Sequence, residues 1–252
     1  MEKQVRSFLS ALLLVVILAC GRSPPPAARV LFIGNSYTSV NDLPHMLTTL
    51  AAAGKHPLTV DMMAVGGATL AQHLQTPAIG DRLAAQQWNF VVLQEQSVVP
   101  AVATARSVGM YPAVRELVST IRARGAKPIL LLTWGRRDGL PEEGYHDYRT
   151  MQSEITAGYL AIADELQVIV APVGVAWMTA VREDPGLALW LADGSHPSVA
   201  GSFLAACTLY ATIYHQSPVG LPAPAGLTDE LARRLEGFAA GTVLGNPGMW
   251  HN

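Results

Sequence analysis

Apolar residues along the chain follow two different spacings, and segments of the two kinds alternate. Short runs that are apolar at nearly every position, many of them β-branched, predict strands buried on both faces. Longer segments in which apolar residues recur every three or four positions predict helices with one buried face. The predicted strands cover residues 30–33, 58–64, 90–93, 128–133 and 168–170. The predicted helices cover residues 43–53, 70–87 with a break at Pro77, 103–124, 145–166, 198–214 and 228–240.

The alternation of strand and helix predicts an α/β protein with a three-layer α/β/α architecture. About five parallel strands form the central sheet, and helices cover both of its faces. The clearest helical stripe lies in residues 145–166, and its regular spacing favours burial in the core over ligand binding. It consists of Tyr148, Met151, Ile155, Tyr159, Ile162 and Leu166. In such sheets the loops that follow the strands converge on one crevice, where we expect the chemistry.

Composition adds a domain boundary near the N-terminus. With 252 residues, of which 50% are hydrophobic and 14% charged, the chain can bury a full core, and residues 29–252 are predicted to form one domain. Residues 1–19 predict a secretory signal peptide, because Lys3 and Arg6 precede an apolar stretch that is short for a membrane span. Ala19 before Cys20 resembles a bacterial lipobox, although an ordinary signal peptide with an incidental cysteine is the alternative. The lipobox implies that Cys20 is lipidated and that the proline-rich residues 20–28 are a tether.

These features predict a protein of the bacterial cell envelope, anchored in a membrane through its lipid on the periplasmic or outer face. The net charge of −2 and the absence of a basic run argue against a nucleic-acid partner. Cys207, the second of two cysteines, lies in an apolar segment and is expected to be a buried hydrophobic residue outside any disulfide. The histidines show no metal-ligand spacing, so neither a metal nor a cofactor is expected.

Candidate chemistry comes from two segments far apart in the chain. Ser36 follows Gly34 and Asn35 at the end of the first predicted strand, and Asp193 precedes His196 by three residues. A serine hydroxyl is a poor nucleophile unless an imidazole accepts its proton, and a carboxylate must orient that imidazole. The spacing therefore predicts a hydrolase in which Ser36 is the nucleophile, His196 the base and Asp193 the orienting acid. Alone, Ser36 would be read as a turn or N-cap hydroxyl.

The order of these segments resembles that of the SGNH, or GDSL-type, hydrolases. The resemblance covers roughly residues 29–215, and Asn35 stands where the usual Gly-Asp-Ser motif has aspartate. It implies that a glycine after the second strand contributes an oxyanion-binding N–H, and Gly67 in the run Gly66-Gly67-Ala68-Thr69 is the candidate. It also implies an ester substrate, either a small molecule or a carbohydrate.

The segment after the third predicted strand departs from the family. Where the family has Gly-x-Asn-Asp, this chain has Gln94-Glu95-Gln96-Ser97, which resembles a subgroup with such a run. A glutamine side chain also carries an amide donor, so Gln96 or Gln94 completes the oxyanion hole, and the choice between them stays open. For Glu95, a structural role is favoured over acid or base catalysis because strand alternation places its side chain opposite both glutamines.

After the fourth predicted strand, Trp134 and three charged residues leave two interpretations open. They form either a packed indole with solvated charges, or an aromatic wall and cationic rim for a sugar or acyl group. The charged residues are Arg136, Arg137 and Asp138. The overall prediction is a serine esterase, with an O-acetyl carbohydrate as one candidate substrate. The alternative is a catalytically weak envelope lipoprotein that uses the same fold to bind carbohydrate or another ligand.

Overall fold

A computed structural model describes residues 27–251, and its centre is a five-stranded parallel sheet with the order β2-β1-β3-β4-β5. The strands are β1 (Ala28–Gly34), β2 (Leu58–Ala64), β3 (Phe90–Leu93), β4 (Lys127–Leu131) and β5 (Ile169–Ala171). The predicted sheet of about five parallel strands is confirmed. β1 begins at Ala28, the last residue assigned to the tether, because this residue already pairs with Leu58. The signal peptide and Cys20 lie outside the described residues.

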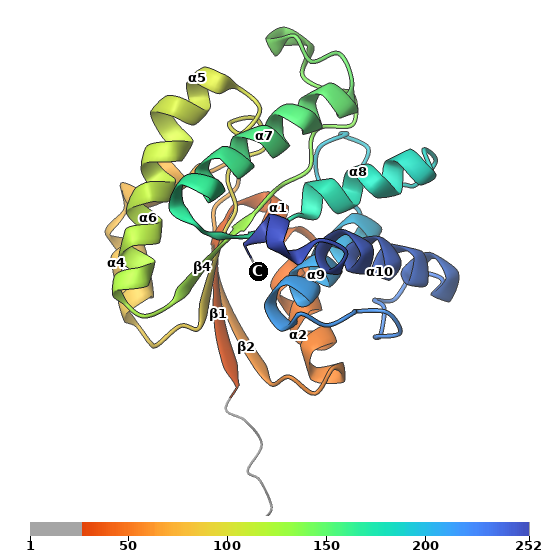
Figure 1. Ribbon diagram of the computed structural model, residues 1–252, viewed down its shortest axis with the longest axis horizontal. Helices are drawn as coiled ribbons and strands as arrows, with labels where there is room; N and C mark the ends of the chain where they lie inside the picture. Colours follow the sequence, from red (N-terminus) through yellow and green to blue (C-terminus); the bar gives the residue numbers. More distant parts are fainter. Residues whose placement is uncertain (1–26, 252) are drawn as a thin grey trace, which may run out of the picture.

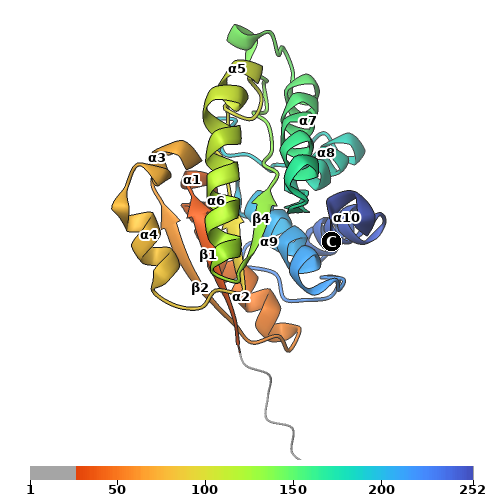
Figure 2. The same ribbon diagram turned by 60° about the vertical axis from the view of Figure 1, so that its left-hand side comes forward.

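Helices cover both faces of the sheet, as Figure 1 shows. One face is covered by α2 (Leu43–Ala53), α8 (Val173–Glu183), α9 (Val199–Tyr214) and α10 (Asp229–Leu244). The other is covered by α3 (Leu70–Leu74), α4 (Pro77–Ala84), α6 (Tyr111–Ala123) and α7 (Tyr148–Leu166). In Figure 2, α6 lies in front of the sheet. Shorter elements are α1 (Ser36–Ser39), α5 (Ala103–Ala105), a π-helical turn at Arg106–Met110, and 3₁₀ turns at Val40–Asp42, Pro141–Glu143 and Pro247–Trp250. The three-layer prediction is confirmed.

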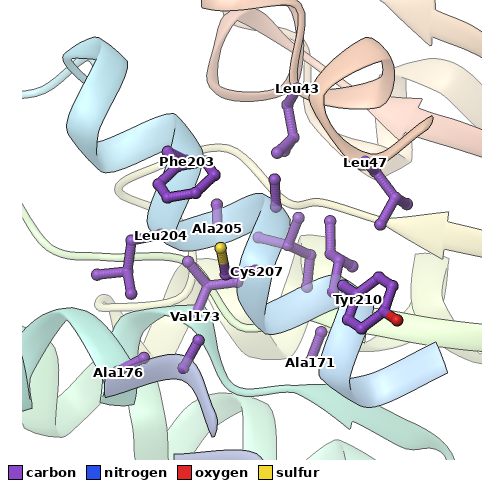
Figure 3. Packing of buried hydrophobic residues seen from close by; sticks show 14 of the residues in the cluster. Leu43, Leu47, Ala171, Val173, Ala176, Phe203, Leu204, Ala205, Cys207 and Tyr210 are labelled. Atoms are coloured by element: carbon purple, nitrogen blue, oxygen red, sulfur yellow. The ribbon is translucent and has the colours of Figure 1, made fainter. Parts of the chain in front are cut away.

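The two hydrophobic cores follow from the alternation of side chains along each strand. In β1, Val30 and Phe32 pack in one core while Leu31 and Ile33 pack in the other, and all four are at most 1% exposed. Figure 3 shows α9 between residues of α2 and α8, with Cys207 among its inward side chains. Burial raises the pKa of the Cys207 thiol well above its ordinary value. Its predicted place in the core is confirmed.

Helix boundaries differ from the prediction where local sequence competes with the apolar pattern. The pattern predicts no helix over residues 173–183, where α8 lies; its β-branched residues Val173, Val175 and Val181 favour strand locally. The predicted helix over residues 103–124 is divided by the π-helical turn. Ser198 caps α9 through its hydroxyl, which accepts a hydrogen bond from the Gly201 N–H at 3.2 Å.

The sheet order also locates the crevice. The chain passes from β1 outward to β2 and then returns to place β3 on the other side of β1. The connections leave on opposite faces, because α2 joins β1 to β2 on one face and α3 and α4 join β2 to β3 on the other. A cavity therefore opens beyond the carboxyl ends of β1 and β3. Among residues 27–251, no helix has the length and apolar character that a membrane crossing requires.

Candidate active site

Ser36 lies at this crevice because the chain turns directly from β1 into α1. Asn35, in extended conformation, caps α1, and its Oδ1 accepts a hydrogen bond from the Tyr37 N–H at 3.0 Å. The Asn35 side-chain amide also donates to the Ala68 carbonyl at 3.0 Å. This residue is 2% exposed and joins the turn of the serine to the loop that contains Gly67. An aspartate at the same position would have no amide hydrogen to give to Ala68.

The structure brings the three predicted residues Ser36, His196 and Asp193 into one line of hydrogen bonds. The Ser36 Oγ lies 2.9 Å from His196 Nε2, and His196 Nδ1 lies 2.6 Å from Asp193 Oδ2. With Nδ1 donating to the carboxylate, Nε2 of a neutral imidazole is free to accept the serine proton. The hydrogen bond from His196, followed by that from the Ser195 N–H, lowers the pKa of Asp193 to about 2. Asp193 is therefore charged at neutral pH.

An aromatic stack supports the loop that contains His196. Tyr37 stacks on Trp134, with ring centroids 4.5 Å apart, and Trp134 stacks on Trp177 at 4.3 Å. The Trp134 Nε1–H donates to the Ser195 carbonyl at 3.0 Å, and the Tyr37 hydroxyl lies 2.8 Å from Ser195 Oγ. Trp134 is fully buried, so the packed indole is the correct interpretation and the aromatic wall is wrong. Sequence reasoning missed Tyr37, because the residues it contacts are distant in the chain.

The structure separates the two candidate glutamines. Gln94 is 1% exposed, and its Oε1 accepts hydrogen bonds from the Asn35 N–H and the Thr38 hydroxyl, both at 2.9 Å. Its Nε2 donates to the Glu95 carbonyl at 2.5 Å. The Cβ of any residue other than glycine at position 34 would lie 2.5 Å from Gln94 Oε1. Gln94 is therefore a buried brace under the serine turn, and it is not placed to donate to a substrate.

Gln96, in contrast, is partly exposed and lines the crevice with Ser36 and Gly67. Its Oε1 accepts hydrogen bonds from the Val98 and Val99 N–H groups at 2.7 and 3.2 Å. These contacts define the orientation of the amide and leave Nε2 as the free donor.

Backbone donors are also available. Gly67 has a φ of +70°, a left-handed conformation that favours glycine. Within residues 27–251, neither its N–H nor that of Ser36 donates to a protein acceptor.

The crevice has a volume of about 430 Å³, and most of its lining residues carry polar side chains. Its lining residues include Ser36, Gly67, Gln96, Arg136 and His196. In the part of the chain that the structure describes, no three His, Cys, Asp or Glu residues group as metal ligands would.

Glu95 lies behind the crevice and connects two of its loops. Its side chain is fully buried, and Oε1 accepts hydrogen bonds from the Gln96 N–H at 2.7 Å and the Leu70 N–H at 3.2 Å. Its other oxygen, Oε2, is buried with no partner in the described structure. Burial is the main cause that raises the pKa of Glu95 from 4.5 to about 7. A buried carboxyl that bridges two loops agrees with the structural role that the sequence favours for Glu95.

Among known proteins, several solved structures are similar to this chain. No family model matches the chain. No curated protein matches it either. A protein from Slackia heliotrinireducens that is assigned to the SGNH hydrolases is 34% identical; the match covers 74% of this chain and 99% of that one, with a TM-score of 0.63.

Two further structures have lower identity and support the fold alone. A DUF4886 family protein from Bacteroides uniformis is 20% identical over 86% of this chain and 95% of its own, with a TM-score of 0.74. An acetylxylan esterase from Geobacillus stearothermophilus is 18% identical over 75% of this chain and 95% of its own, with a TM-score of 0.59.

Replacing Glu95 with glutamine tests the cost of the buried charge. Because the folded-state pKa is raised, the stability contributed by protonated Glu95 is full below pH 4.5 and is lost as the pH rises through about 7. Glu95→Gln should therefore match the wild type near pH 5 and exceed it near pH 8, by up to about 3 kcal/mol in the free energy of unfolding. Urea denaturation between pH 5 and 8.5 measures this difference. Glu116→Gln, on the exposed side of α6, is the control; a pH-independent difference for Glu95→Gln would contradict the assignment.

Proposed function

The chain belongs to the SGNH hydrolase family, and from that premise we propose that it is a serine esterase that acts through an acyl-enzyme on Ser36. The observation that carries the proposal is the unbroken line of hydrogen bonds from Ser36 Oγ through His196 to Asp193, with distances of 2.9 and 2.6 Å. These distances allow proton transfer without rearrangement of the side chains.

In the first half of the reaction, Ser36 Oγ attacks the ester carbonyl while His196 Nε2 takes the hydroxyl proton. The tetrahedral intermediate collapses when His196 gives that proton to the leaving oxygen, and the alcohol departs. In the second half, a water molecule loses a proton to His196 and attacks the acyl-enzyme. The imidazolium then returns the proton to Ser36 Oγ as the carboxylic acid leaves. Asp193 keeps the imidazole oriented and stabilises its charged form throughout.

The negative oxygen of each intermediate needs donors that are already in place. The N–H groups of Ser36 and Gly67 and the Nε2 of Gln96 fill this role in our proposal, since all three residues line the crevice and none of these donors is used within residues 27–251. Donors held before the reaction cost no reorganisation when the charge develops. The positions of Gln96 Oε1 and of the Ala68 carbonyl support this arrangement. The first is held by the Val98 N–H of its own loop, and the second by the Asn35 side chain of the serine turn.

The substrate we propose is an O-acylated carbohydrate with a short acyl group such as acetyl. The crevice has a volume of only about 430 Å³ and is lined mostly by residues with polar side chains, whereas a long acyl chain would need an extended apolar groove. An acetylxylan esterase shares the fold, which is compatible with this class. The alternative, a weakly catalytic carbohydrate-binding lipoprotein, would need no activated serine, so labelling of Ser36 separates the two.

We also propose that Cys20 anchors the protein in a membrane of the cell envelope. The lipobox residues support this proposal. β1 runs from Ala28 toward Ser36, so the chain enters the sheet at the end opposite the crevice. Seven residues of strand span about 23 Å. This arrangement keeps the crevice away from the anchored end and accessible to envelope polymers.

Removal of the nucleophile tests the enzyme proposal. Ser36→Ala should lower kcat for p-nitrophenyl acetate by about 10⁴-fold, because it removes the hydroxyl that lies 2.9 Å from His196 Nε2. A fluorophosphonate probe should label the wild type and leave Ser36→Ala unlabelled. His196→Ala should also abolish labelling, while Ser39→Ala, three residues along α1, serves as the control. Full activity of Ser36→Ala would rule out the mechanism.

The two glutamines should give different phenotypes. Gln96→Glu keeps the acceptor for the Val98 and Val99 N–H groups but loses the donor, so kcat should fall by about 100- to 1000-fold with the fold retained. Gln94→Ala leaves buried partners unsatisfied and should lower the free energy of unfolding by at least about 2 kcal/mol. Initial rates and urea denaturation measure the two effects. Normal activity of Gln96→Glu would remove Gln96 from the oxyanion hole.

Lipidation is tested by expressing the full chain with radiolabelled palmitate in a Gram-negative host. The wild type should incorporate label and sediment with membranes, whereas Cys20→Ser should do neither. Cys207→Ser is the matched control, because Cys207 is buried in the core, and it should be labelled like the wild type. Equal labelling of Cys20→Ser and the wild type would exclude the anchor.

A further inference from the structure

Among residues 27–251, Arg136 is the only lysine, arginine, aspartate or glutamate that lines the crevice. It forms no salt bridge with any residue in the described range 27–251, and its Nε is buried without a hydrogen-bond partner there. The next residue is different, because Arg137 pairs with Asp138 at 2.9 Å and is exposed. A guanidinium group offers five N–H donors and no acceptor. Arg136 therefore presents unused donors and an uncompensated positive charge in the crevice that Ser36 also lines.

The backbone around Arg136 is held firmly. The Gly135 N–H donates to Gln152 Oε1 at 2.7 Å, and the Gly135 carbonyl accepts from Trp190 Nε1 at 3.0 Å. On the other side, the Arg137 N–H donates to the Gly194 carbonyl at 2.8 Å. Gly194 lies between Asp193 and His196 in sequence. These hydrogen bonds connect residues 135–137, which follow β4, to the loop that contains Asp193 and His196. They fix the backbone position of Arg136 relative to the reacting groups.

We propose that Arg136 binds a carboxylate of the substrate, so that the preferred esters carry one carboxylate near the scissile bond, as an O-acylated acidic sugar does. This inference rests on the proposed esterase function and names its substrate class. A guanidinium matches the two oxygens of a carboxylate in a paired hydrogen-bond geometry. In the described part of the chain, the crevice lining contains one guanidinium and no acidic side chain, which matches a single negative charge.

The charge balance of the reaction supports the same assignment. When His196 accepts the serine proton it becomes a cation paired with Asp193, and repulsion from the unpaired charge of Arg136 in the same crevice makes that step less favourable. A substrate carboxylate bound to Arg136 removes this repulsion when the imidazolium of His196 forms. A neutral substrate leaves the repulsion in place. The carboxylate could belong to the alcohol part or to the acyl part of the ester, and the two sources can be tested separately.

The test compares matched pairs of esters on the full-length protein. For the alcohol side the pair is methyl glucuronoside O-acetate, with a free carboxylate, against methyl glucoside O-acetate. For the acyl side it is mono-p-nitrophenyl succinate against p-nitrophenyl butyrate. In the wild type, kcat/KM for the charged member of at least one pair should exceed that for the neutral member by about ten- to a hundredfold. Arg136→Gln should abolish that ratio, mainly through a higher KM.

Arg137→Gln is the matched control, since Arg137 is already paired and does not line the crevice, and it should keep the wild-type ratio. Arg136→Lys should keep part of it, because a lysine retains the charge without the planar fork. Each ratio is internal to one variant, so partial unfolding cancels. If Ser36-dependent hydrolysis is present but neither pair shows a preference, or if Arg136→Gln lowers both members equally, the carboxylate site is wrong while the esterase proposal stands. Absence of any Ser36-dependent hydrolysis would overturn both.

Discussion

The active-site arrangement depends on the hydrogen bonds that Gln94 makes at the carboxyl ends of β1 and β3. The parallel register sets Ile33 opposite Leu93, and the Gln94 N–H continues the ladder to the Ile33 carbonyl at 2.9 Å. Beyond that point the two strands separate, and the hydrogen bonds to the segment after β1 come from the Gln94 side chain instead of the backbone. Its Oε1 satisfies the Asn35 N–H and the Thr38 hydroxyl. Because a buried donor without a partner costs about 1–3 kcal/mol, this glutamine determines how the serine turn can leave the sheet.

From this brace, hydrogen bonds extend to the other loops of the crevice. Asn35 connects the serine turn to the Gly67 loop through the Ala68 carbonyl. Glu95 connects the start of α3 to Gln96 through its carboxyl oxygen. Both connections use buried side chains on short segments directly after strands. A shift of one strand would therefore move Ser36, Gly67 and Gln96 together, so their positions relative to one another change less than their individual positions.

The sequence predicts the elements with strong local patterns and leaves the choices that depend on distant neighbours open. The five strands follow from their apolar runs, and the segment from Asp193 to His196 follows from the geometry of one turn. The sequence could not decide between Gln94 and Gln96, because strand alternation gives both the same side and holds only as far as Leu93, where β3 ends. The burial of Trp134 was equally undetermined, since its partners Tyr37 and Trp177 belong to other segments.

The exposure of the triad explains why packing, more than charge, must hold it. The side chains of His196 and Asp193 are 34% and 47% exposed, so solvent screens the interaction between them and its contribution to stability is small. What positions the loop is the Tyr37–Trp134–Trp177 stack together with the Trp134 hydrogen bond to Ser195. Aromatic pairs contribute about 0.5–1.5 kcal/mol each beyond burial and are insensitive to salt. The loop can thus leave the His196 side chain partly open to solvent and still keep its Nε2 within hydrogen-bond distance of Ser36.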